Sequence, residues 1–270
     1  MAVGLFKRLT GRTLPKVVLT EMRLDDWQPS LRWRLKVALQ RFAFGAVDLM
    51  CVSARREAEA YAQRLRLPLE RFRFVPWHTN VLSPEMHPSR GAYAFAAGRT
   101  GRDWRTLAAA LHGLDVEMKI VCTRADASTI DFPANATVLT DVPYAMYRRL
   151  LEDAAIVVIP LEPHVYSSGQ VVILEAMALG KPVIATRVTG SEDYVDDGVD
   201  GILVEPGSVE QLRVALARVM ESTSWRQTLG EAALQRVLRQ HTLEGYASRV
   251  LALTAELCAP EVERRGTGHR

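Results

Sequence analysis

Two arginines stand close together in a segment whose residue types suit the binding of a diphosphate. The segment reads GRTGR from Gly98 to Arg102 and follows the apolar run Tyr93–Ala97. Glycine lets the backbone approach a ligand at the carboxyl end of a strand, where open α/β sheets bind their ligands. Arginine forms paired hydrogen bonds with phosphate oxygens and neutralises their charge. The pattern indicates either an anion site or an ordinary surface loop, and the motif alone leaves both open.

A second segment, running from Tyr166 to Pro182, joins a polar turn to an apolar helix. Ser167 or Ser168 can cap this helix, and Gly169 leaves its first backbone amides uncovered. Such a helix N-terminus attracts phosphate through free N–H groups and the helix dipole. Glu175 lies about two turns along, among apolar residues, so its carboxylate needs donors that ribose hydroxyls would supply. The alternative is a glutamate that faces solvent.

The elements that must position these segments alternate between strand and helix along the whole chain, which is typical of α/β proteins with parallel sheets. The strands predicted after residue 92 suffice for one complete Rossmann-like sheet, whereas those before residue 80 make about half of one. The predicted strands are Val17–Thr20, Asp48–Ser53, Arg71–Val75, Tyr93–Ala97, Glu117–Cys122, Ala136–Leu139, Ala155–Pro160, Pro182–Thr186 and Ile202–Val204. The predicted helices are Ser30–Phe44, Arg55–Leu65, Asp103–Leu114, Pro143–Glu152, Ser168–Leu179, Ser208–Ser222 and Trp225–Leu257, the last with breaks near Gln240–Thr242. Residues 123–135 read as a polar loop.

The composition is that of a globular protein in a reducing compartment. Of 270 residues, 48% are apolar, which is ample for a packed core. No apolar run approaches the roughly 20 residues of a membrane span, and the first residues lack the features of a secretory signal. Three cysteines, Cys51, Cys122 and Cys258, are scattered without metal-ligand spacing. We therefore expect a cytoplasmic protein.

Positive charge is concentrated at the start of the chain. Residues 1–41 hold nine lysines and arginines against three acidic residues. Within them, Ser30–Phe44 has an apolar set at near-helical spacing, made of Leu31, Leu35, Ala38, Leu39 and Phe42. Either this set packs on a core and leaves a basic face in solvent, or the helix lies on an anionic membrane surface at the inner face of the membrane. No nucleic-acid-binding motif accompanies the charge, so nucleic acid is not an expected partner.

The stretch Ser168–Gly207, which includes VVILEAMALGKPVIATRVTGSEDYVDDGVDGILVEPG, resembles the nucleotide-sugar half of family 4 GT-B glycosyltransferases (glycosyl transferases group 1). The resemblance extends to GRTGRDWRTL, RFRFVPW and QHTLEGYASRVLALTAEL, and covers nearly all of residues 15–258. It implies an α/β, GT-B-like fold with a partial N-terminal, acceptor-side domain over residues 1–82. Residues 83–240 would form the complete nucleotide-sugar-binding domain, and 241–270 a helix that returns to the first domain, with a tail.

The resemblance also implies an activity, namely retaining, metal-independent transfer of a hexose from a nucleotide diphosphate sugar to a glycan or lipid-linked acceptor, with no cofactor. Arg99 and Arg102 would bind the diphosphate and stabilise the leaving group, and Glu175 would hold the ribose hydroxyls. These three are the implied catalytic residues. The other implied donor-binding residues are Gly98, Thr123, Arg124, Val142, Tyr166, Ser167, Ser168, Gly169, Gln170 and Val171.

Two departures from the family pattern support a second interpretation. Ser167 stands where the first glutamate of the family's E-x7-E pair would precede Glu175, and the first strands of the N-terminal domain have no counterpart. Asp25, Asp26 and His78 are then the nearby polar candidates on the acceptor side. The chain could accordingly be a non-catalytic nucleotide-sugar-binding subunit that needs a partner chain for its acceptor half. Lys181, in the turn after the predicted helix, is expected to be exposed.

Overall fold

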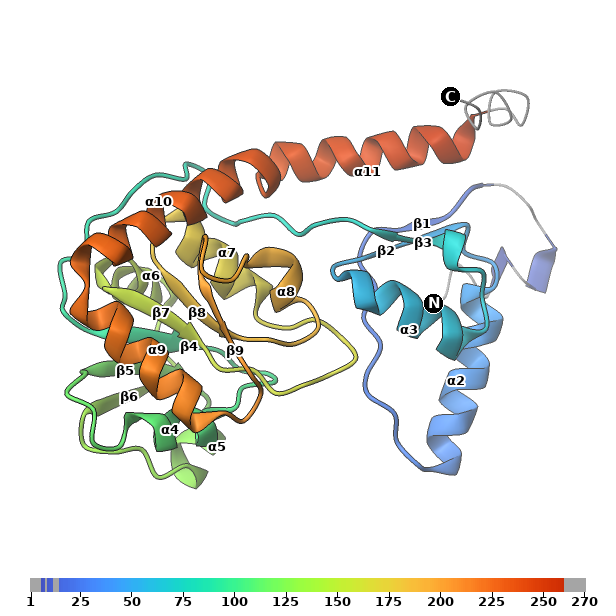
Figure 1. Ribbon diagram of the computed structural model, residues 1–270. Coiled ribbons are helices and arrows are strands. Elements are labelled where there is room, and N and C mark those ends of the chain that lie inside the picture. Colours follow the sequence, from blue (N-terminus) through green and yellow to red (C-terminus); the bar gives the residue numbers. More distant parts are fainter. Residues whose placement is uncertain (1–5, 8, 12–14, 260–270) are drawn as a thin grey trace. The chain divides into compact units, whose positions relative to one another are not determined.

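The computed structural model describes residues 6–7, 9–11 and 15–259, which divide into two compact units (Figure 1). The larger unit runs from Trp77 to Leu243. The smaller unit combines the described residues up to Pro76 with those from Glu244 onward. Each unit is built on a parallel sheet, so the predicted α/β fold class is confirmed. No helix among the described residues is both long and apolar enough to span a membrane.

The larger unit contains a six-stranded parallel sheet in the order β6-β5-β4-β7-β8-β9. Its strands are β4 (Ala94–Ala97), β5 (Met118–Cys122), β6 (Ala136–Thr140), β7 (Ile156–Ile159), β8 (Val183–Thr186) and β9 (Ile202–Val204). The chain lays down β4, β5 and β6 in one direction, then returns to the centre and adds β7, β8 and β9 in the other. The order therefore reverses between β4 and β7, and open α/β sheets bind ligands beyond the carboxyl ends of the strands at such a reversal.

Helices cover both faces of this sheet because its central strands alternate between two apolar cores. Phe95 and Val157 point into a core shared with α6, α7 and α10, whereas Ala96 and Val158 point into a core shared with α4 and α9. The helices are α4 (Trp104–Leu111), α5 (Arg124–Thr129), α6 (Tyr144–Asp153), α7 (Gln170–Ala178), α8 (Ser191–Tyr194), α9 (Val209–Glu221) and α10 (Thr223–Gln240). The expected polar loop over 123–135 was wrong in part, since Thr123 and Asp126 form a capping box that starts α5.

The smaller unit contains a three-stranded parallel sheet in the order β1-β2-β3. Its elements are β1 (Val18–Leu19), α2 (Leu31–Phe44), β2 (Leu49–Val52), α3 (Arg55–Leu65), the 3-10 turn η1 (Leu69–Arg71), β3 (Phe72–Phe74) and α11 (Leu243–Cys258). Its core includes Met50, Tyr61 and Leu65. The Tyr246 hydroxyl of α11 donates to the carbonyl of Thr20 over 3.1 Å.

The packing of α2 differs from the interpretation that its predicted apolar set faces a core. The buried residues of α2 are Val37, Gln40, Ala43 and Phe44. The predicted set, Leu31, Leu35, Ala38, Leu39 and Phe42, is exposed throughout. The helix itself was predicted correctly, but the side that packs on the rest of the unit is the opposite one.

Candidate functional site

A pocket of about 680 Å³ lies at the carboxyl ends of β4, β5 and β6. Its walls come from the loops that follow these strands, from the first turns of α6 and α7, and from Asn80. The volume falls within the range of about 300–1,000 Å³ that is typical of small-molecule sites. The pocket therefore occupies the edge of the sheet where its topology predicts a ligand site.

Glu175 provides the buried charge of this pocket. Its side chain is only 2% exposed, and the Tyr147 hydroxyl donates a 2.6 Å hydrogen bond to Glu175 Oε2. Burial, together with the negative charge of Glu175, raises the pKa of Tyr147 above that of an ordinary phenol, so Tyr147 stays protonated and donates. The tyrosine ring packs against Phe95 at 5.8 Å and against Tyr144 at 5.9 Å. The sequence indicated that a buried Glu175 needs donors, but it did not identify Tyr147 as one.

The loop after β4 holds its two arginines in different surroundings. Arg102 lies against the backbone, where Nε donates to the Ala97 carbonyl over 3.0 Å and a second guanidinium nitrogen donates to the Thr100 carbonyl over 2.9 Å. A Cβ atom at Gly98 would lie 2.2 Å from Arg102 Nε, so glycine leaves room for this guanidinium. Burial lowers the pKa of Arg102 to about 10, which still leaves it charged at neutral pH. Arg99 is exposed and lines the pocket.

The same loop is hydrogen-bonded to the segment that joins β7 to α7. Asp103 N donates to the Pro160 carbonyl, and Glu162 N donates to the Gly101 carbonyl, both over 3.1 Å. A Cβ built on Gly101 would lie 3.3 Å from Ser168 Oγ, which places the two predicted ligand segments in contact. The topology thus joins residues that lie about 70 positions apart in the sequence.

Gly169 begins α7 with a left-handed backbone, at φ +85°. A Cβ atom there would lie 3.0 Å from Ile159 Cγ2 and 3.1 Å from a methyl group of Leu161, so both the backbone angle and the space require glycine. Ser167 is buried and accepts a hydrogen bond from Gln170 Nε2. The buried ring of Tyr166 is stacked on His164, with centroids 4.6 Å apart.

Two short loops complete the wall opposite α7. The Thr123 hydroxyl donates to Asp126 Oδ2 over 2.6 Å and so fixes the turn between β5 and α5. Arg124 forms an ion pair with Asp141, the residue that follows β6. Asp141 has a left-handed backbone, at φ +53°, a conformation that aspartate tolerates better than most residues.

Most residues that line this pocket lie in a segment that matches a known family, and the chain is similar to several curated proteins. The model of the glycosyl transferases group 1 family matches residues 102–222. A sucrose synthase from Acidithiobacillus caldus is 30% identical over 112 residues, which cover 40% of this chain and 14% of that protein. A D-inositol 3-phosphate glycosyltransferase from Kribbella flavida is 35% identical over 101 residues, or 35% of this chain and 24% of that protein. Residues 102–222 of the larger unit thus resemble a group 1 glycosyltransferase domain.

Solved structures extend the likeness in fold to both units. The Anabaena protein Alr3699/HepE, in complex with UDP and glucose, superposes with a TM-score of 0.75 at 18% identity, covering 94% of this chain and 74% of that one. Sucrose-phosphate synthase from Thermosynechococcus elongatus gives 0.68 at 22% identity, covering 85% and 64%. At these identities the likeness shows the fold, which is GT-B-like as the sequence predicted. The chain spans about a seventh of the length of the sucrose synthase and about a quarter of the length of the D-inositol 3-phosphate glycosyltransferase.

The larger unit brings about half of the predicted donor residues into the pocket. Those that line it are Gly98, Arg99, Thr123, Arg124, Val142, Val171 and Glu175. Those that do not line it are Arg102, Tyr166, Ser167, Ser168, Gly169 and Gln170, and their contacts with a donor stay predictions. The pocket adds residues that the motifs did not single out, including Asn80, Asp141, Tyr144 and Tyr147. Only the two tyrosines had a signal, since they lie three residues apart on a predicted helix.

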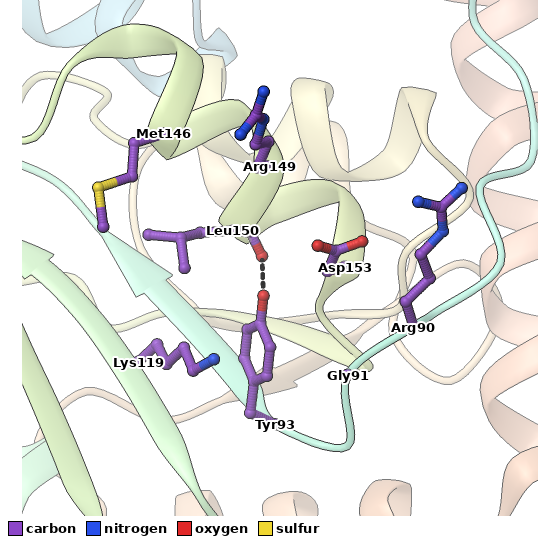
Figure 2. A pocket seen from close by; sticks show the side chains of 8 residues that line it. All are labelled: Arg90, Gly91, Tyr93, Lys119, Met146, Arg149, Leu150 and Asp153. Atoms are coloured by element: carbon purple, nitrogen blue, oxygen red, sulfur yellow. Dashed lines mark hydrogen bonds between the residues drawn. The ribbon is translucent and has the colours of Figure 1, made fainter.

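A second, smaller pocket of about 240 Å³ lies at the amino-terminal edge of the same sheet (Figure 2). There the Tyr93 hydroxyl donates to the Leu150 carbonyl over 2.9 Å, and Lys119 Nζ lies 3.7 Å from the centre of the Tyr93 ring. Asp153 offsets part of the positive charge of Arg90 and Arg149 in this pocket. Tyr93 and Lys119 are thus engaged within the protein, and the pocket lies at the sheet edge that open α/β folds do not use for ligands.

The expectation that Lys181 is exposed was wrong. Its side chain is 1% exposed, and Nζ donates to the His87 carbonyl over 2.8 Å. The segment around His87 covers the turn, because Glu85 N and His87 N donate to the carbonyls of Ala178 and Leu179. Burial lowers the pKa of Lys181 to about 8.

Proposed function

We propose that this chain binds a nucleotide diphosphate sugar in the larger pocket and transfers the hexose, with retention of configuration, to a glycan or lipid-linked acceptor. The observation that carries the proposal is the meeting of an exposed arginine, a buried carboxylate and the start of α7 at the topological reversal of the sheet. UDP-glucose is the first donor to test, because the Anabaena neighbour was solved with UDP and with UDP-glucose.

In this proposal each pocket residue recognises one part of the donor. Arg99 binds the diphosphate, since in the described part of the chain its guanidinium has no hydrogen-bond or ion-pair partner. Glu175 accepts hydrogen bonds from the ribose hydroxyls while Tyr147 holds the carboxylate from the other side. The loops at Thr123 and Val142 border the base.

The chemical step in this proposal depends on the leaving group. The bond between the anomeric carbon and the diphosphate oxygen breaks, and the electron pair leaves with the diphosphate. Arg99 stabilises the charge that develops there. The acceptor oxygen then bonds to the anomeric carbon on the same face, and its proton passes to the departing phosphate oxygen. This route needs no strong protein base, and Glu175 is already engaged by Tyr147.

The donor site can be tested by calorimetry with UDP. A hydrogen bond to a charged group is worth about 1.5–3 kcal/mol, so Arg99→Ala and Glu175→Gln should each weaken UDP binding roughly 10- to 150-fold. Arg90→Ala, an exposed arginine of the second pocket, and Glu117→Gln, an exposed glutamate, are the matched controls and should bind UDP as the wild type does. Unchanged affinity in either site variant would remove that residue from the site.

A second candidate function is nucleotide-sugar binding without transfer by this chain alone, with a partner chain supplying the acceptor half. Ser167 favours it, because the family pattern has a carboxylate at this position and a serine brings no charge. Donor hydrolysis or transfer measured with the purified chain, alone and with cell extract, separates the two. Turnover by the chain alone supports the transferase, whereas binding alone with turnover only in extract supports the binding subunit.

A further inference from the structure

Helix α2 of the smaller unit carries apolar residues on two opposite sides. Val37, Gln40, Ala43 and Phe44 are buried within the unit. Arg41 Nε donates to the Arg64 carbonyl of α3 over 2.9 Å, and the two helices lie side by side (Figure 1). This side of α2 therefore accounts for the attachment of the helix to its own unit.

The opposite side forms an exposed apolar stripe, made of Leu31, Leu35, Ala38, Leu39 and Phe42. The exposed fractions of its large side chains are 71% for Leu31, 64% for Leu35, 45% for Leu39 and 41% for Phe42. At about 100° per residue, the centre of the stripe lies roughly 180° from the centre of the buried side. Trp27, itself 64% exposed, lies at the start of the helix with its ring centre 5.9 Å from that of Trp33.

Basic side chains flank the apolar stripe on both sides. On the same helical projection, Arg32 and Lys36 fall along one flank, and Arg34 and Arg41 along the other. The helix contains no acidic residue. Lys36 pairs with Asp25 over 2.6 Å, but Arg32 and Arg34 are exposed, and in the described residues neither has a hydrogen-bond or ion-pair partner.

We propose that the apolar stripe of α2 inserts into the surface of an anionic lipid bilayer, with the helix axis parallel to the membrane plane. An apolar stripe between two rows of lysine and arginine is the arrangement of helices that lie at the lipid–water interface. The stripe enters the acyl boundary while the basic side chains reach the headgroups. Charge complementarity selects this occupant, because a second copy of the same stripe would bring Arg32 and Arg34 against like charges. The inference is independent of the donor site.

Flotation of the full chain with vesicles tests the proposal. The chain should float with phosphatidylcholine vesicles that contain about one third phosphatidylglycerol, less so in high salt, and not with phosphatidylcholine alone. Each basic residue near an anionic surface strengthens binding by roughly fivefold, so Arg32→Gln with Arg34→Gln should weaken it about 25-fold. Leu31→Ser with Leu35→Ser should weaken it more than 100-fold, since each buried leucine contributes over tenfold.

Matched substitutions and two further measurements make the outcome decisive. Leu82→Ser with Leu251→Ser changes two exposed leucines elsewhere and should leave flotation unchanged. All variants should have the melting temperature of the wild type and should bind UDP with the same affinity, because the changed side chains are exposed. Failure to float with anionic vesicles at low salt would overturn the proposal, as would flotation that persists in the Leu31/Leu35 variant. A dimer in light scattering that this variant dissociates, without lipid binding, would also overturn it and assign the stripe to a second copy.

Discussion

Tyr147→Phe removes a single oxygen from the pocket and thereby isolates the hydrogen bond that holds Glu175. The bond is 2.6 Å long and its acceptor is a carboxylate that is 2% exposed. Hydrogen bonds to charged groups contribute about 1.5–3 kcal/mol, and the larger value applies when the acceptor is left buried without its donor. For a domain of this size each kcal/mol shifts the melting temperature by about 2–4 °C, so Tyr147→Phe should lower it by roughly 3–12 °C.

Thermal unfolding followed by circular dichroism measures this effect, and Tyr144→Phe is the matched control. Tyr144 stacks on Tyr147 and loses the same atom in the variant, but its side chain is 62% exposed. The control should therefore melt with the wild type. With saturating UDP the gap between Tyr147→Phe and the wild type should narrow, because ribose hydroxyls then donate to the carboxylate that lost its partner.

A double-mutant cycle with Glu175→Met decides whether the loss arises from this pair. If the hydrogen bond is the cause, the effects of the two substitutions are non-additive by about 1–3 kcal/mol. If the changes in unfolding free energy are additive within about 0.5 kcal/mol, the reasoning is refuted. It is also refuted if Tyr147→Phe and Tyr144→Phe have the same melting temperature. If saturating UDP leaves the difference in melting temperature between Tyr147→Phe and the wild type unchanged, the hydrogen bond still explains the loss of stability. That result would, however, contradict the role of Glu175 toward ribose.

Two further substitutions test the backbone and the buried charge. Gly169→Ala should destabilise the larger unit by about 1–3 kcal/mol, because φ is +85° and the added Cβ lies 3.0 Å from Ile159 Cγ2. Gly198 has a similar φ of +77°, and a Cβ atom added there would have no neighbour within 4 Å, so Gly198→Ala should lose less stability. Equal midpoints of urea unfolding for the two variants would contradict the steric contribution at Gly169. Lys181 has a pKa of about 8 in the folded protein against 10.5 unfolded, so the wild type should gain about 3 kcal/mol in unfolding free energy as pH rises from 8 past 10. Lys181→Met should lack this gain, and parallel pH curves from urea melts would contradict the burial argument.

The sequence predicted the strands and helices because their signals are local. Apolar runs of four to six residues separated by amphipathic stretches give the parallel sheet, and each predicted strand is present within one or two residues. The short helices α5 and α8 were missed, since four to six residues are too few to show a helical period. The predicted binding segments lie together for a topological reason, because residues that follow parallel strands meet at one edge of the sheet, however their side chains pack.

Side-chain partners could not be predicted in the same way. Whether Lys181 faces water depends on the segment around His87, which lies more than 90 positions earlier in the chain. The two sides of α2 present the same difficulty, because Val37 and Phe44 on one side and Leu31 and Leu35 on the other are similarly apolar. Periodicity identifies both sets but does not say which one the rest of the unit covers.

The two arginines of the loop after β4 also differ in their side-chain partners, although the sequence pattern predicts the same role for both. A guanidinium has five N–H donors, and Arg102 already directs two of its nitrogens to the carbonyls of Ala97 and Thr100 from a partly buried position over Gly98. Its main effect is therefore to fix the loop that carries Arg99. Arg99 lines the pocket from an exposed position, so an anion can reach its donors without breaking an existing contact. Of the two, we therefore expect Arg99 to meet a diphosphate and Arg102 to hold the loop that carries Arg99.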